Sequence, residues 1–240
     1  MVRYLYDVIG AVSGVALFVL LVILLRGPIR KFPFLFAYIT ADFLVTCALT
    51  VASVVWIGAD ASGTGVGAQR YNLLYWLTSV LLALLRFLVV ISLTYEATQE
   101  GAQRRHAARV LSGIVVAAIV LPFLVFSSTF TPWPTSRWFN KTGEMLNFAA
   151  AIMNLVLWGA LIASRSRDRQ LMRVSAGLGV MVAGLALSYG IRRMVQSGSV
   201  AVLPNLFLQF TQLGAWAIWI WTFWPVPKPQ TPPEAAISSR

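Results

Sequence analysis

The chain has 240 residues, and its 19 lysines and arginines against 8 aspartates and glutamates give a formal net charge of +11 at pH 7. Hydrophobic residues make up 58% of the chain and charged residues only 11%. An ordinary soluble domain is about 25% charged, so this composition excludes that class and indicates a membrane protein. The basic residues lie in short clusters between apolar stretches. Membrane topology and anionic lipid headgroups therefore explain the charge better than nucleic-acid binding does.

Seven apolar segments have about the length that a helix needs to cross a bilayer. The predicted spans are residues 4–25, 34–57, 71–95, 110–126, 145–163, 174–191 and 204–224. The sequence therefore predicts an all-α fold, a polytopic bundle of seven transmembrane helices in residues 1–224. Residues 225–240 are rich in proline, and we expect them to form a disordered cytoplasmic tail.

Two further sequence features predict how parts of the chain pack. Gly10 and Gly14 form a GxxxG pair, which lets a second helix backbone come close. The longest predicted loop, residues 127–144, is rich in aromatic side chains. Such side chains are typical of the membrane–water boundary, and here they are Phe130, Trp133, Trp138 and Phe139.

The distribution of lysine and arginine predicts the orientation. Seven spans place the termini on opposite sides of the membrane. The first, third and fifth turns and the tail hold Arg26, Arg30, Lys31, Arg104, Arg105, Arg109, Arg165, Arg167, Arg169, Arg173, Lys228 and Arg240. The other side holds Arg3, Arg70, Arg137, Lys141, Arg192 and Arg193. Because the side richer in basic residues stays cytoplasmic, we expect the N-terminus outside and the C-terminus inside.

Two opposite charges lie deep inside predicted spans. Asp42 is about 12 Å along the second span from its cytoplasmic start, and Arg86 is about 13 Å from the cytoplasmic end of the third. A lone charge in hydrocarbon costs at least a few kcal/mol unless it meets a partner or water. We therefore predict that Asp42 and Arg86 form an intramembrane ion pair. The pair has either a functional role or a purely structural one that locks two helices together.

A set of polar side chains lies in the outer half of the predicted bundle. If they converge, they form a pocket that opens to the outside and has aromatic walls. The alternative is that they make ordinary hydrogen bonds between helices. The set comprises Asp7, Tyr71, Tyr75, Asn147, Asn154, Tyr189, Arg192, Asn205, Gln209 and Gln212.

Patterns of known membrane enzymes are missing from the sequence. There is no HExxH or GxSxG motif, no pair of aspartates on facing helices and no cluster of His and Cys, so we expect no catalytic residues, no metal site and no cofactor. A retinal protein needs a lysine in its last span, and residues 204–224 contain none. The single cysteine, Cys47, can form no intramolecular disulfide.

Part of the pattern resembles a known group of proteins. Tyr75-Trp76, the apolar run that follows and Tyr95-Glu96 at its end resemble uncharacterised seven-helix integral membrane proteins of acidobacteria, and the tryptophan-rich end of the seventh span is similar too. The resemblance implies this architecture and no particular function.

The functional prediction is a non-enzymatic component of a bacterial inner membrane, either a sensor of a small outer ligand or a scaffold. Besides the lipid bilayer, we expect a cytoplasmic protein partner that contacts the basic turns or the proline-rich tail. A small-solute transporter is the alternative.

Overall fold

The computed structural model describes residues 2–27, 30–57, 65–97, 103–125, 136–163, 168–194 and 203–224. Within these ranges the chain forms helices and no strands, which confirms the predicted all-α class. The α-helices are α1 (Val2–Arg26), α2 (Pro33–Ala52), α3 (Val66–Ala97), α4 (Gln103–Val125), α5 (Ser136–Ala163), α6 (Arg169–Met194) and α7 (Leu203–Phe223). The end of α2 continues into a π-helical turn over Ser53–Ile57.

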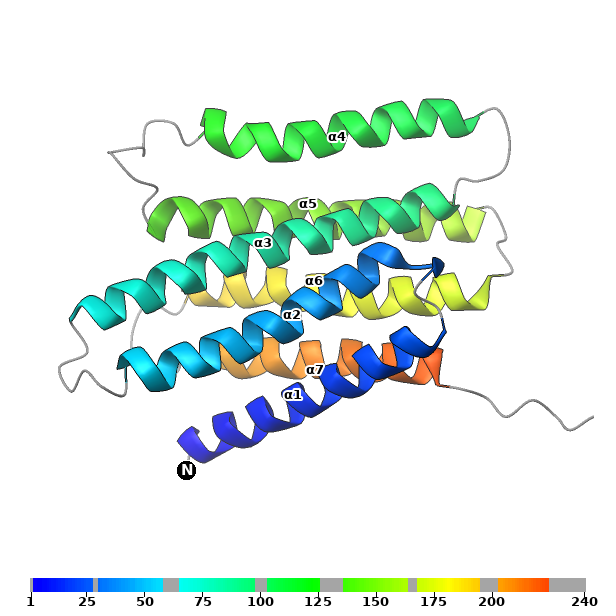
Figure 1. The fold of residues 1–240 in the computed structure, drawn as a ribbon. Helices are drawn as coiled ribbons and strands as arrows, with labels where there is room; N and C mark the ends of the chain where they lie inside the picture. The colour runs from blue at the N-terminus through cyan, green and yellow to red at the C-terminus, as the bar shows by residue number, and fades with distance from the viewer. Residues whose placement is uncertain are drawn as a thin grey trace, which may run out of the picture.

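The helices form two rows, and each helix runs opposite to the one before it in the chain (Figure 1). Helices α1, α2 and α3 pack side by side in that order, and α7, α6 and α5 form the second row. The rows meet where α1 contacts α7 and where α3 contacts α5 and α6. Helix α4 lies at one edge against α3 and α5. The fold thus contains two groups of three helices with one helix beside them.

Four stretches within these helices are long and apolar enough to cross a membrane: Val8–Arg26, Pro33–Trp56, Val66–Ala97 and Arg169–Arg192. The outward faces of the bundle carry large apolar side chains that are mostly exposed, such as Val54, Leu155 and Ile162. A water-soluble monomer rarely exposes so much apolar surface. These findings indicate a protein that resides in a membrane.

The contact between α6 and α7 is centred on Trp219, which is fully buried. Its indole Nε1 donates a hydrogen bond of 2.9 Å to the backbone oxygen of Val174. A Cβ atom at Gly177 would lie only 2.5 Å from Nε1 and 2.8 Å from Cδ1 of the same ring. The absence of a side chain at Gly177 is therefore what lets the indole pack against α6.

Basic and aromatic residues join the elements at one end of the bundle. Lys31, just before α2, forms a salt bridge of 2.9 Å with Asp168, just before α6. Asp168 also caps α6, because its Oδ1 accepts hydrogen bonds from the backbone N–H groups of Gln170 and Leu171. Partial burial raises the pKa of Asp168, but the hydrogen bonds from Lys31 and from the backbone outweigh it and hold the pKa below its usual range.

The same end contains a cation–π contact between α6 and α7 of the second row. The guanidinium of Arg173 lies 4.2 Å from the ring centre of Trp221, so the first turns of α6 contact the last turns of α7. The ends of α1, α3, α5 and α7 and the starts of α2, α4 and α6 all lie at this end of the bundle (Figure 1). It is the end that the distribution of lysine and arginine predicts to be cytoplasmic.

Two packing expectations are corrected. Residues 136–144 are helical and form the start of α5 instead of a loop, and both Trp138 and Phe139 in them are buried within the bundle. Phe130 and Trp133 lie outside the described residues. No neighbouring atom lies within 4 Å of a Cβ placed at Gly10 or Gly14, so the GxxxG pair does not contact another helix in this structure.

Candidate functional site

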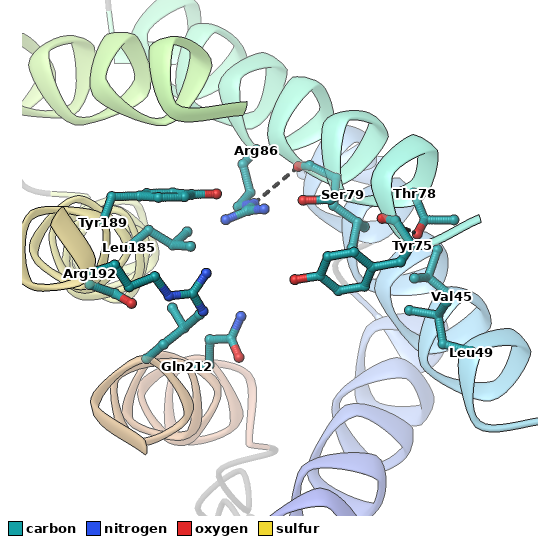
Figure 2. A pocket seen from close by; sticks show the side chains of 13 residues that line it. Val45, Leu49, Tyr75, Thr78, Ser79, Arg86, Leu185, Tyr189, Arg192 and Gln212 are labelled. Atoms are coloured by element: carbon teal, nitrogen blue, oxygen red, sulfur yellow. Dashed lines mark hydrogen bonds between the residues drawn. The ribbon is translucent and has the colours of Figure 1, made fainter. Parts of the chain in front are cut away.

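A cavity of about 160 Å³ lies between the two rows, at the half of the bundle opposite the Lys31–Asp168 end. Helices α2 and α3 line it from one row, and α6 and α7 line it from the other (Figure 2). The lining residues are Val45, Leu49, Tyr75, Thr78, Ser79, Leu82, Arg86, Leu185, Ser188, Tyr189, Arg192, Leu208 and Gln212. Along α3 the cavity extends from Tyr75 to Arg86, a rise of about 16 Å at 1.5 Å per residue.

Arg86 forms the deep end of the cavity. Its side chain is only 6% exposed, and its Nε donates a hydrogen bond of 3.1 Å to the backbone oxygen of Leu82. The Nη1 atom is buried and has no hydrogen-bond partner among the described residues. Figure 2 shows the guanidinium turned into the open space, with the ring of Tyr189 beside it. Leaving a buried charged donor unsatisfied costs more than the roughly 1–3 kcal/mol of a neutral one, so this site favours a ligand that accepts hydrogen bonds.

Arg192 approaches the same space from the end of α6. It is exposed, and its Nη2 donates a hydrogen bond to Oδ1 of Asn205 on α7. Figure 2 shows its guanidinium facing Tyr75 across the cavity, with Gln212 of α7 below. One turn earlier on α6, Ser188 donates a hydrogen bond of 3.0 Å to the backbone oxygen of Pro204. The end of α6 is therefore tied to the start of α7 by two hydrogen bonds.

Asp42 does not line the cavity. Its side chain is 8% exposed and accepts a hydrogen bond of 3.2 Å from the hydroxyl of Tyr38. No direct salt bridge joins Asp42 to Arg86, although the charge of Arg86 is close enough to act on the Asp42 carboxylate. The two charges are thus separated by a gap in this structure, and the ion pair predicted from sequence stays a prediction.

Only some of the polar residues predicted to form an outer pocket line the cavity. Tyr75, Tyr189, Arg192 and Gln212 line the cavity, and Asn205 holds Arg192. The cavity lining does not include Tyr71, Asn147, Asn154 or Gln209. The side chain of Asp7 lies outside the described part of the chain.

One of the residues outside the cavity makes a hydrogen bond between helices. The Oδ1 of Asn154 accepts a hydrogen bond of 3.3 Å from Ser175, which joins α5 to α6 as the simpler interpretation expected. Sequence reasoning did not find the hydroxyl groups of Thr78, Ser79 and Ser188 in the cavity wall.

A second hollow adjoins the cavity and shares Tyr189 and Arg192 with it. Its volume is about 300 Å³, it is more open than the cavity, and Trp76, Asn140 and Glu144 complete its lining. Because Arg192 stands between the two spaces, a molecule that enters the hollow meets Arg192 before it reaches Arg86.

Comparison with known proteins gives no relative: no family model, curated protein or solved structure matches the chain. Within the described ranges, no group of three His, Cys, Asp or Glu side chains is placed to hold a metal ion. The chemical capacity of the site therefore rests on the cavity itself. Two guanidinium groups, several hydroxyls and an amide line it, next to aliphatic walls.

Proposed function

We propose that the chain is an integral protein of a bacterial inner membrane that crosses it seven times, with the N-terminus outside and the C-terminus in the cytoplasm. It binds a small ligand in the cavity from the outer side and acts as a non-enzymatic sensor or scaffold. The alternating direction of the helices supports the seven spans. The cluster of basic residues around Lys31, Arg169 and Arg173 at the opposite end supports the orientation.

The observation that carries this proposal is the cavity between the rows. Small-molecule sites are concave, mostly apolar and fitted with a few convergent polar groups, and four helices here surround such a space. Buried polar atoms in proteins almost always have a hydrogen-bond partner. The buried Nη1 of Arg86 has none and faces the cavity, and helix packing alone does not explain this arrangement. A sensor must also pass its signal on, and the basic turns or the tail would do so by contacting a cytoplasmic protein.

Ligand binding can be tested by filling the cavity. Ser79→Trp places a large ring in the cavity wall, and Ser112→Trp places the same ring on an exposed position of α4. The full-length proteins, purified in a maltoside detergent, are screened by thermal unfolding against small acids, amines, sugars and amides. At least one compound should stabilise the wild type and Ser112→Trp but not Ser79→Trp. If no compound in this panel does so, the ligand-binding proposal is wrong.

The orientation has an independent test. Cys47 is replaced by serine, and one cysteine is then introduced either as Arg30→Cys or as Arg70→Cys. A membrane-impermeant maleimide should label the Arg70→Cys protein on intact spheroplasts and the Arg30→Cys protein only after lysis. The reverse pattern would invert the proposed topology.

Transport of a small solute is the second candidate function, and the arrangement of the helices favours it specifically. The cavity lies between one group of three helices and another, with α4 set aside, so rocking of the groups against each other would open it to either side. A transporter accumulates or exchanges the ligand in proteoliposomes. A sensor binds the same ligand without flux and changes its association with a cytoplasmic protein.

A further inference from the structure

Resting on the proposed ligand-binding role, we propose that the cavity ligand is a small organic monocarboxylate. Arg86 and Arg192 hold its carboxylate, and the aliphatic wall receives its apolar body.

The charges that line the cavity favour an anion. Arg86 and Arg192 both line it, and no described lining residue is acidic. Asp42 does not line it, and Glu144 lines the neighbouring hollow. Inside the cavity a cationic ligand would therefore meet two guanidinium groups and no acidic side chain, whereas an anion is attracted from Arg192 toward Arg86.

The hydrogen-bonding groups favour a carboxylate over a simple neutral ligand. Arginine carries five N–H donors in a planar fork that matches the two oxygens of a carboxylate. Nε of Arg86 is used by the backbone of Leu82, and the buried Nη1 is left without a partner. A carboxylate oxygen at Nη1 satisfies this donor and brings charge complementarity to a site of low polarity.

The remaining wall sets the size and character of the ligand body. Five aliphatic side chains line the cavity, namely Val45, Leu49, Leu82, Leu185 and Leu208. The cavity volume of about 160 Å³ is close to the engineered cavity of about 150 Å³ that holds one benzene molecule. A body of about four to seven carbon atoms fits this space.

The test compares each acid with its uncharged isostere. The full-length protein is purified in an uncharged maltoside detergent. Calorimetric titrations then compare the binding of benzoate with that of benzamide, and the binding of butyrate with that of butyramide. At least one carboxylate should bind about tenfold or more tightly than its amide, since losing a charged hydrogen bond has an effect of this size. Sulfate, phosphate and phosphatidylglycerol are titrated in parallel.

Three variants assign the effect to the two arginines. Arg86→Gln and Arg192→Gln should each weaken carboxylate binding about tenfold or more and weaken amide binding less, because the amide carries no charge. Arg173→Gln is the matched control, because Arg173 contacts Trp221 at the far end of the bundle and should bind the carboxylate as wild type does. If Arg86→Gln does not fold, the comparison of Arg192→Gln with Arg173→Gln still decides the result.

Several outcomes would overturn the assignment. They are equal binding of acid and amide, binding of inorganic anions or anionic lipid only, no carboxylate binding at millimolar concentration, or equal losses in the control variant. The ligand-binding role itself is judged separately by the Ser79→Trp screen. A neutral or cationic compound that loses binding in Ser79→Trp would leave the cavity a ligand site and refute only its preference for carboxylates.

Discussion

The packing of Trp219 against Gly177 gives a stability prediction that follows directly from atomic distances. In Gly177→Ala the new Cβ would lie 2.5 Å from Nε1 of Trp219, about 1 Å inside an ordinary contact between such atoms. The indole is fully buried and held by its bond to Val174, so it cannot move aside freely. Overpacking of this kind costs about 1–3 kcal/mol, and we expect a loss in that range for Gly177→Ala.

A second substitution should relieve the clash. Trp219→Phe removes Nε1 and vacates part of the space, at a cost of about 1 kcal/mol for the hydrogen bond plus lost packing. In the double variant the smaller ring shifts away and the new methyl fills part of the gap. We therefore expect the double variant to be less destabilised than the sum of the two single variants, by about 1–2 kcal/mol.

The free energy of unfolding is measured by far-UV circular dichroism during titration of maltoside micelles with dodecyl sulfate. Gly190→Ala is the matched control in the same helix, because no neighbouring atom lies within 4 Å of its Cβ position. It should be neutral or stabilising by up to about 1 kcal/mol, as alanine is the better helix former. If Gly177→Ala is as mild as Gly190→Ala, or if the effects of Gly177→Ala and Trp219→Phe simply add, the described contact between α6 and α7 is wrong.

Three further predictions use the same unfolding assay. Asp42→Asn and Arg86→Met should each destabilise the protein. The loss in the double variant should be smaller than the sum of the two single losses, because the two charges are predicted to interact. Additive losses would refute this interaction. Asp168→Asn should cost under about 1 kcal/mol, since the salt bridge with Lys31 is partly exposed, whereas Asp168→Ala should cost about 1 kcal/mol more because alanine cannot cap α6. The pKa of Asp168 is lowered by folding, so its stabilisation is complete above the usual pKa of about 4 and is lost as the pH falls below it. The loss of stability in acid should therefore be smaller in Asp168→Asn than in the wild type. If the free energy of unfolding of the two proteins depends on pH in the same way, this prediction is wrong.

Much of the helical order was predictable because hydropathy measures the length of apolar stretches. It does not mark where a helix begins, since the polar turns at the ends of a membrane helix have the composition of a loop. Helix α5 begins at Ser136 although the predicted span began at residue 145, and α6 begins at Arg169 although its span began at residue 174. For α6 a local signal was present, because Asp168 is a favoured N-cap residue.

The candidate site was predictable only where a residue was unusual for its surroundings. Arg86 is the single basic residue of a long apolar run, and so it could be found. Thr78 could not, since threonine in a membrane helix commonly bonds to its own backbone, as Thr78 does to the oxygen of Leu74. Asn154 and Gln212 look alike in sequence, but one joins two helices and the other lines the cavity. The rotation of each helix about its axis decides between them, and packing sets that rotation.

The hydrogen bonds between the end of α6 and the start of α7 have a mechanical consequence. Arg192 is bonded to Asn205, and Ser188 to Pro204, so a force on the Arg192 side chain acts on the first turn of α7. Helix α7 is continuous from Leu203 to Phe223, and Trp221 near its other end contacts Arg173. An anion that draws Arg192 inward would therefore pull on the start of α7. The other end of α7 directly precedes the proline-rich tail in sequence.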